Sequence, residues 1–282
     1  MIKRLLRWLG IAVGGVLAVA LLALAAAYFV SEHIIQHRWA VPRTTVAVPT
    51  DTVSIAEGRR LAIVRGCFGG CHGKEAAGVV MFDEPLLARL VAPNLTAAVR
   101  KYSDAELDGI IRAGVRPDGR STIVMPAEVF AGLTDADLGR IIAFLRSLPA
   151  AEGPGADIRF GPLGRVGLAV GQFKMTAQQL AEVVPPPEGQ GEVATDGRYL
   201  ARTICAQCHG TSLRGFSTPD FTAPSLQVVN AYPADSFTEL LKAGVGLGGR
   251  SLPMMGPWAR RNLSKLTDRE IAALYSYLHA MQ

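Results

Sequence analysis

The chain has 282 residues, a formal net charge of +5 at pH 7 and a hydrophobic fraction of 49%. This length allows one large domain or two small ones. Lys3, Arg4 and Arg7 supply three of the positive charges, and no cluster of Lys and Arg follows them, which excludes a nucleic-acid-binding face. All four cysteines fall in two short clusters that each end in histidine, so none remains for a long-range disulfide.

The N-terminal segment is typical of a membrane anchor. Residues 9–30 contain no charged side chain, and as a helix they are long enough to cross a hydrocarbon core about 30 Å thick. The basic residues before them place the N-terminus in the cytoplasm, with Tyr28 and Trp39 near the far interface. We therefore expect residues 1–40 to form a single-pass anchor in the cytoplasmic (inner) membrane, with the remaining chain in the periplasm. A cleaved signal peptide is the alternative, although its apolar region usually runs only about 7–15 residues.

The rest of the sequence contains an internal repeat. Residues 102–120 (YSDAELDGIIRAGVRPDGR) resemble residues 232–250 (YPADSFTELLKAGVGLGGR), and residues 133–148 resemble residues 266–281. In each half of the chain the two segments follow a cysteine cluster in the same order, which indicates a duplicated domain. We expect one domain at residues 50–150, a second at residues 191–282, and a Gly- and Pro-rich linker at residues 151–190.

The repeated segments are helical in pattern. Thr134 with Asp137, Thr267 with Glu270, and Ser103 with Glu106 have the spacing of helix-start capping pairs. Apolar residues then recur at helical spacing, whereas strand-like alternation is scarce. These features predict an all-α protein. Within the linker, residues 160–173 are apolar and Gly-rich, which leaves open whether they pack against a domain or touch the membrane surface.

The second cysteine cluster carries the clearest chemical signal. Residues 205–209 read CAQCH, the C-x-x-C-H pattern of covalent c-type haem attachment. Two thiols on one turn of chain, Cys205 and Cys208, can add to the two vinyl groups of a porphyrin. His209 then directs its imidazole at the iron.

The first cluster, CFGGCH at residues 67–72, has three residues between Cys67 and Cys71. Gly69 and Gly70 can let the extra residue bulge outward, because glycine adopts conformations that other residues avoid. The cluster occupies the same place in the repeat as the second one, which favours haem attachment here too, with His72 as the iron ligand. A zinc site or a redox dithiol is the alternative, but each repeat offers only three such ligands and no βαβ setting.

Methionine is the usual second iron ligand in electron-transfer cytochromes. Aligning the two Gly-Arg-Ser segments pairs Met125 with Met255, and we expect these as the second ligands, with Met254 the rival of Met255. Met81 and Met175 are expected to fill the core. Pro93 and Pro224 follow the clusters at comparable positions. Their carbonyl groups either accept a hydrogen bond from the ligating histidines or belong to ordinary loops.

Together, the C-x-x-C-H helix, the Pro-x-Leu loop, the Gly-Arg-Ser…Met segment and the terminal LTD helix resemble the class I cytochrome c domain. Two such domains behind one N-terminal helix resemble the membrane-anchored bacterial dihaem cytochromes c. The resemblance implies two covalently attached haem c groups. Haem one would be held by Cys67, Cys71 and His72, and haem two by the residues Cys205, Cys208 and His209.

This resemblance leads us to expect an electron carrier and not an enzyme. Its redox partners would be a quinol-oxidising complex or a dehydrogenase on the donor side, and an oxidase or a soluble cytochrome on the acceptor side. One alternative is a haem-bearing subunit fixed in a respiratory, photosynthetic or dehydrogenase complex. Another is a dihaem redox enzyme such as a peroxidase, but methionine at both sixth positions would close the iron to substrate.

Overall fold

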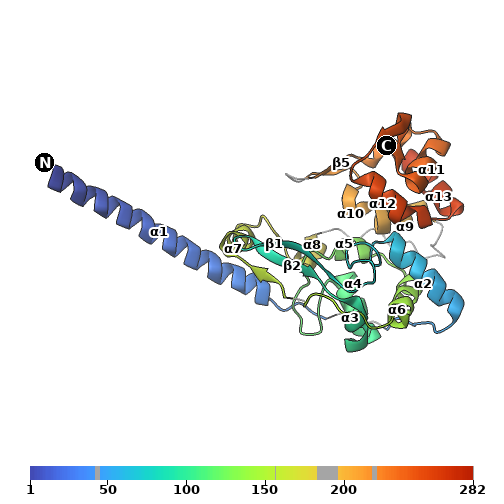
Figure 1. The fold of residues 1–282 in the computed structure, drawn as a ribbon, viewed down its shortest axis with the longest axis horizontal. Helices are drawn as coiled ribbons and strands as arrows, with labels where there is room; N and C mark the ends of the chain where they lie inside the picture. The colour runs from blue at the N-terminus through green and yellow to red at the C-terminus, as the bar shows by residue number, and fades with distance from the viewer. Residues whose placement is uncertain (42–44, 156, 183–195, 218–220, 282) are drawn as a thin grey trace.

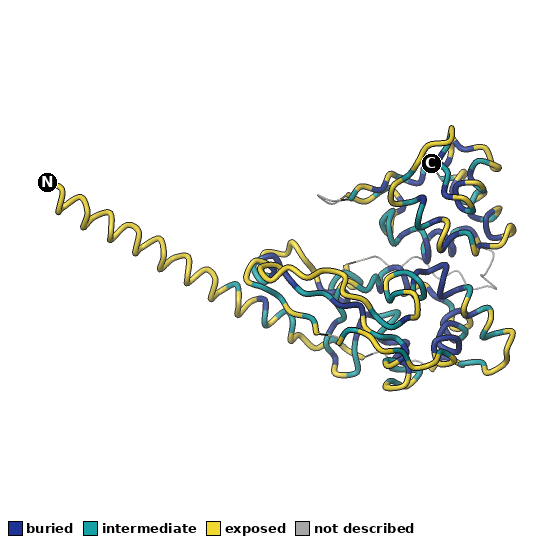
Figure 2. Tube along the Cα trace, in the orientation of Figure 1, coloured by how far each residue is buried: buried dark blue, intermediate teal, exposed yellow. Residues whose placement is uncertain are grey.

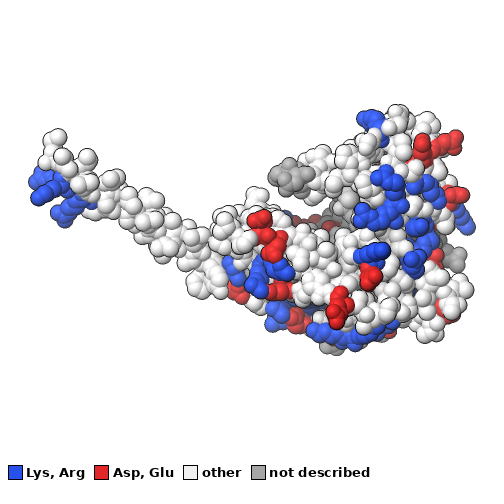
Figure 3. All heavy atoms as spheres, in the orientation of Figure 1, with Lys and Arg blue, Asp and Glu red and all other residues white. Residues whose placement is uncertain are grey.

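The structure, a computed structural model, describes residues 1–41, 45–155, 157–182, 196–217 and 221–281. A long helix, α1 (Ile2–Gln36), projects from a mainly helical body (Figure 1). Its residues are exposed over most of its length (Figure 2), and its Lys and Arg residues gather at the free end (Figure 3). Among the described residues, α1 is the one helix long and apolar enough to cross a membrane, a test that a signal sequence also passes.

The first repeat folds between two helices that cross closely, α2 (Thr52–Val64) and α6 (Asp135–Ser147). A Cβ atom on Gly58 would lie 1.9 Å from the carbonyl oxygen of Arg140, so only glycine permits this approach. The elements between the two helices are β1 (Val79–Glu84), β2 (Ala88–Ala92), α3 (Leu95–Lys101), α4 (Asp104–Ala113) and α5 (Ala127–Phe130).

The β1–β2 hairpin was not expected from the sequence. β1 is exposed along its whole length, and Met81 on it is 47% exposed, so the expectation that Met81 fills the core is wrong. Met175 is buried, as expected.

The stretch expected as a linker contains three elements: β3 (Arg159–Phe160), α7 (Pro162–Ala169) and α8 (Thr176–Glu182). β3 pairs with β2 to complete a three-stranded antiparallel sheet, and α7 packs on α1. At the start of α8, the backbone N–H of Ala177 donates to Ser121 Oγ at 2.8 Å. These elements therefore join the first repeat to α1. Residues 183–195 lie outside the described residues.

The second repeat has the same plan. A Cβ on Gly197 would lie 2.0 Å from the carbonyl oxygen of Ala273, which reproduces the close crossing of the first repeat. Its helices are α9 (Gly197–Leu200), the π-helix η1 (Ala201–Cys205), α10 (Ala206–His209), the 3-10 helix η2 (Leu226–Ala231), α11 (Ala234–Ala243), the 3-10 helix η3 (Leu247–Gly249), α12 (Met255–Arg261), the 3-10 helix η4 (Leu263–Lys265) and α13 (Asp268–His279). Its strands are β4 (Phe216–Ser217), β5 (Thr222–Ala223), β6 (Val245–Gly246) and β7 (Arg250–Ser251).

The capping pairs expected from the sequence are confirmed. The backbone N–H of Asp137 donates to Thr134 Oγ1 at 3.1 Å at the start of α6. Ser103 with Glu106, and Thr267 with Glu270, form complete capping boxes at α4 and α13. Each cap satisfies backbone donors that a helix start leaves unpaired.

The two repeats share one hydrophobic core, which runs from Leu61 in α2 to Leu278 in α13. α2 is the element between them, since it packs on α6 of its own repeat and on η4 of the other. At this contact the Asn262 side-chain amide donates to the carbonyl oxygen of Ile63 at 2.6 Å, and both groups are buried. Because α2 leads directly to the first cysteine cluster, that cluster is held at the interface between the repeats.

Candidate haem-binding sites

The first cysteine cluster follows a sharp change of direction at the end of α2. Gly66 has φ +76°, a conformation that L side chains rarely adopt. The Cys71 backbone N–H then donates to the carbonyl oxygen of Gly66 at 2.9 Å, which closes the turn. Gly69 has φ +77° and open space where a Cβ would stand. Gly69 thus has the free space and the backbone conformation that an outward bulge of the extra residue would need.

The second cluster continues a helix instead of leaving one. η1 ends at Cys205, and α10 carries the cluster as far as His209. Four residues of helix place Cys205 and Cys208 on the same face, because residues three apart are neighbours on a helix. The two clusters thus present similar residues from different local backbones.

Both histidines are oriented by a proline carbonyl. Nδ1 of His72 lies 2.8 Å from the carbonyl oxygen of Pro93, and Nδ1 of His209 lies 2.8 Å from that of Pro224. A carbonyl oxygen only accepts, so Nδ1 must donate in both rings, and Nε2 keeps its lone pair for a metal. Burial lowers the pKa of His72 and His209, which favours the neutral form that ligates iron.

The backbone after each histidine is also repeated. The Gly78 N–H donates to the carbonyl oxygen of His72 at 2.9 Å, and the Gly215 N–H to that of His209 at 3.1 Å. Positive φ angles recur at matching places in both loops, including two at residues with side chains: Ala76 (φ 56°) and Leu213 (φ 61°). A non-glycine residue in this region costs free energy, so its recurrence indicates a loop shape selected for a shared purpose.

The thiols are protected from ionising. Burial raises the pKa of Cys67 to about 11 and that of Cys205 to about 12, and it raises the pKa of Cys71 and Cys208 as well. No disulfide joins the four cysteines, all of which lie in described segments. Pairs of neutral thiols beside an oriented imidazole suit a porphyrin joined through two thioethers, and the donor set therefore fits haem c.

The methionines differ in their surroundings. Met125 and Met255 are partly buried and pack against the shared core, whereas Met254 is 66% exposed. Val124, directly before Met125, has φ +67°, which is strained for a β-branched residue. Strain of this kind persists where the surroundings over-determine a conformation, often at functional sites. Of the three candidates, Met125 and Met255 are thus the two whose packing suits a fixed ligand.

The two clusters lie next to one another across the interface. The Gln207 side-chain amide, inside the second cluster, donates to the carbonyl oxygen of Arg65 at 3.2 Å, just before the first cluster. The sequence did not show which ends of the repeats meet.

A buried polar network beside the clusters was missed by sequence reasoning. The Arg65 guanidinium is 1% exposed, and it donates to Asp137 Oδ2 at 3.0 Å and to Tyr199 Oη at 3.2 Å. Tyr199 Oη donates to the same Asp137 oxygen at 2.6 Å. Tyr199 stands where the first repeat has Arg60, which forms the matching contact with Glu270 at 2.7 Å. The repeat alignment was the available signal for this pair.

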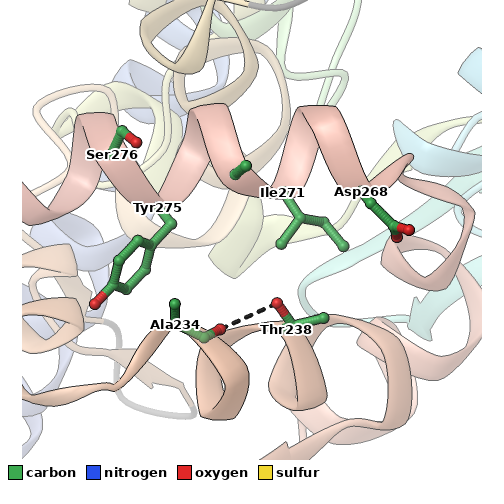
Figure 4. A pocket seen from close by; sticks show the side chains of 7 residues that line it. Ala234, Thr238, Asp268, Ile271, Tyr275 and Ser276 are labelled. Carbon is green, nitrogen blue, oxygen red and sulfur yellow. Dashed lines mark hydrogen bonds between the residues drawn. The ribbon is translucent and has the colours of Figure 1, made fainter.

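A separate hollow lies between α11 and α13 (Figure 4), lined by Ala234, Thr238, Asp268, Ile271, Ala272, Tyr275 and Ser276. Inside it, Thr238 Oγ1 donates to the carbonyl oxygen of Ala234 at 3.0 Å. The lining contains no cysteine, histidine or methionine, so this hollow is distinct from the candidate haem sites.

A helical domain that offers a thiol pair beside a neutral, oriented imidazole is suited to hold an iron porphyrin covalently, which places the protein among electron-transfer haem proteins. The sequence profile of the cytochrome c family matches residues 55–149 and 194–282. The chain belongs to this family, and covalently bound haem c is therefore its cofactor. The family match decides against the zinc and dithiol alternatives.

Three curated proteins illustrate the similarity. The fructose dehydrogenase cytochrome subunit of Gluconobacter japonicus is 21% identical over 256 residues, covering 81% of this chain and 52% of that protein. The cytochrome c subunits of alcohol dehydrogenase (quinone) from Gluconacetobacter polyoxogenes and Komagataeibacter europaeus are each 25% identical over 256 residues, covering 79% of this chain and 54% of the relative. The chain thus spans about half the length of the curated relatives that it matches. These relatives are electron-transfer subunits and not catalytic ones.

Proposed function

We propose that this chain is a dihaem electron-transfer subunit of a membrane-bound dehydrogenase complex. It would receive electrons from a catalytic subunit outside the cytoplasm and pass them to an acceptor at the membrane. The names of the relatives support the subunit interpretation over the freely moving carrier that the sequence first favoured. The observation that carries the proposal is the side-by-side position of two matching clusters on one shared core.

The residues divide into two proposed sites. Haem one is assigned to Cys67, Cys71, His72 and Met125, and haem two to the set Cys205, Cys208, His209 and Met255. Haem iron with histidine and methionine ligands supplies reversible one-electron transfer at a potential raised by the thioether.

The protein itself orients the iron ligands and excludes water from the haem sites. The carbonyl groups of Pro93 and Pro224 fix the tautomer and the direction of the ligating imidazoles. The shared apolar core surrounds the clusters, and its low polarity favours the less charged iron state. Methionine packing at both sixth positions leaves little access for a substrate, which argues against the peroxidase alternative.

The anchor forms part of the same proposal. α1 crosses the inner membrane once, with its basic end in the cytoplasm and both haem domains in the periplasm. An anchor confines the protein to the membrane plane and raises its effective concentration near membrane-bound acceptors.

Haem stoichiometry tests the site assignment. Denatured protein from a host that matures c-type cytochromes should have the mass of the polypeptide plus two haems. The double variant Cys67→Ser/Cys71→Ser, and the matched Cys205→Ser/Cys208→Ser, should each lose one. A wild-type chain with a single haem would refute the assignment at one cluster. The same spectrum shows whether residues 1–40 remain attached.

Purification tests the partner. In mild detergent we expect the chain to migrate with a dehydrogenase subunit whose substrate reduces the haems. If the chain migrates without a dehydrogenase subunit, and its haems are reduced only by other cytochromes, it is a free carrier and the subunit proposal is overturned.

A further inference from the structure

A second apolar surface lies beside α1, outside the haem sites. It consists of Leu86 in the hairpin turn, Leu163 and Val170 in or just after α7, and Phe173, which are 62%, 53%, 66% and 53% exposed. We refer to these four residues as the α7 surface. Apolar side chains that are exposed side by side often mark an interaction site, whereas single exposed apolar residues are common on any protein surface.

The α7 surface is held together by the backbone. The N–H of Leu163 donates to the carbonyl oxygen of Leu86 at 2.9 Å, which ties α7 to the hairpin turn. A Cβ on Gly164 would lie 2.0 Å from the carbonyl oxygen of Leu87, so glycine permits this close packing. The Phe173 ring covers Gly167 from the other side. The surface is therefore a fixed part of the first domain.

Arg165 sets the position of the α7 surface along α1. The guanidinium donates to Glu32 Oε2 at 2.9 Å and to Ser31 Oγ at 3.1 Å, and it lies 4.4 Å from the centre of the Tyr28 ring. These partners stand where the uncharged stretch of residues 9–30 ends. α7 thus packs on α1 at the level where a spanning helix leaves the hydrocarbon (Figure 1).

The position of the α7 surface at the end of the uncharged stretch of α1 favours lipid as its binding partner. At the membrane interface, apolar side chains enter the boundary between headgroups and acyl chains, while tyrosine and long cationic side chains stay at the headgroups. The α7 surface has this composition, with Arg165 and Tyr28 beside its apolar residues. Large apolar side chains of α1 are exposed as far as Val30, and α7 packs on the same helix.

We propose that the α7 surface rests on the outer face of the membrane, as a second lipid contact beside the spanning helix. This inference rests on the proposed anchor. Two contacts, one through α1 and one through α7, fix the tilt of the first haem domain toward the membrane. A single helix followed by a flexible connection would leave that tilt free.

Photocrosslinking of the full chain tests the proposal. Leu163 and Phe173 are each replaced by p-benzoylphenylalanine (Leu163→p-benzoylphenylalanine and Phe173→p-benzoylphenylalanine). The haem-loaded protein is reconstituted in nanodiscs of phosphatidylethanolamine and phosphatidylglycerol and irradiated. Haem absorption equal to wild type shows that each variant is folded. We expect a mass increase of one phospholipid on the peptide that contains the label.

Two controls separate the possible results. The same label at Val16 in α1 reports on the anchor, and at Val53, which is 78% exposed on α2, it reports on chance contact. A lipid adduct at Val16 but none at positions 163 and 173 would overturn the α7 proposal and leave the anchor standing. No adduct at Val16 would overturn the anchor, and the inference with it. Equal adduct yields at Val53 and at positions 163 and 173 would also refute the α7 proposal. The labelled protein is irradiated in native membranes as well, and crosslinking of positions 163 and 173 to a protein there would refute the proposal too.

Discussion

At the scale of single residues, the two sites depend on few atoms with little freedom. The carbonyl oxygens of Pro93 and Pro224 leave the histidines one tautomer, and this needs no other side chain. The methionines are distinguished by packing, since Met255 is set against the core and its neighbour Met254 is exposed. Exposure matters because an iron ligand has to be held in one place.

This difference gives a prediction for the methionines. Met125→Ala and Met255→Ala should each convert one haem from low spin to high spin, because the sixth ligand is lost. Met254→Ala should leave both haems low spin. Electron paramagnetic resonance of the oxidised protein measures the spin state. Loss of low-spin signal in Met254→Ala with none in Met255→Ala would reverse the assignment.

Two glycines, one just before the first cluster and one within it, provide a matched pair for stability. Gly66 and Gly69 have almost the same φ, but a Cβ on Gly66 would lie 2.5 Å from the Trp258 ring and one on Gly69 would meet nothing. We expect Gly69→Ala to cost about 1–2 kcal/mol from backbone strain alone. Gly66→Ala should cost a further ~1–3 kcal/mol from overpacking at the domain interface. Urea unfolding measures both, and equal losses would show that Trp258 yields freely.

At the scale of elements, the paired helices of each repeat are placed by glycine and joined across the interface by polar contacts. Tyr199 in α9 reaches Asp137 in α6, and Arg60 in α2 reaches Glu270 in α13. Each contact links the first helix of one repeat to the last helix of the other. The two contacts occupy equivalent places in the two repeats, and both cross the interface at which the clusters lie next to one another.

Breaking the buried contact should be costly. Asp137→Asn removes the negative charge that balances Arg65 in a site 1% exposed, and we expect a loss of about 3–5 kcal/mol in the free energy of unfolding. The control is Asp104→Asn, which breaks the exposed pair with Arg146 at 2.6 Å and should cost no more than about 1 kcal/mol. Similar losses in the two variants would mean that water reaches Arg65.

At the scale of the whole molecule, Arg60 connects the repeats through charge. It donates to Glu57 within α2 at 2.6 and 2.9 Å and to Glu270 of the other repeat at 2.7 and 2.9 Å. The hydrogen bond from Arg60 is the main reason that the pKa of Glu57 is lowered. Because Glu57 and Arg60 both lie in α2, the stability of the folded protein should therefore respond to acid through this pair.

The sign of this response follows from the lowered pKa. A carboxylate with a depressed folded pKa contributes stability above its unfolded pKa, about 4.3 for glutamate, and loses it as the pH falls through the folded value. We expect wild type to lose stability below about pH 5 more steeply than Arg60→Met, which lacks this interaction. Thermal unfolding from pH 7 to pH 3 measures the difference. Parallel curves would show that Glu57 does not couple to Arg60.

Local sequence determined the chemistry of this protein. The cysteine spacing, the adjacent histidine and the helix caps are all set by residues a few positions apart, so spacing alone predicts them. The repeat also predicted that the first cluster matches the second despite its extra residue. In the structure, the loop after His72 and the loop after His209 have the same backbone shape.

Tertiary structure decided what lies next to what. The burial of Arg65 against Asp137, the contact between the two clusters and the packing of α7 on α1 join residues far apart in the chain. The exposed β1 strand likewise depends on β2, β3 and α7 for its place. Periodicity and spacing report only on neighbours along the chain. Contacts of this kind depend on how complete helices fit together in space, and they become visible only when the chain is folded.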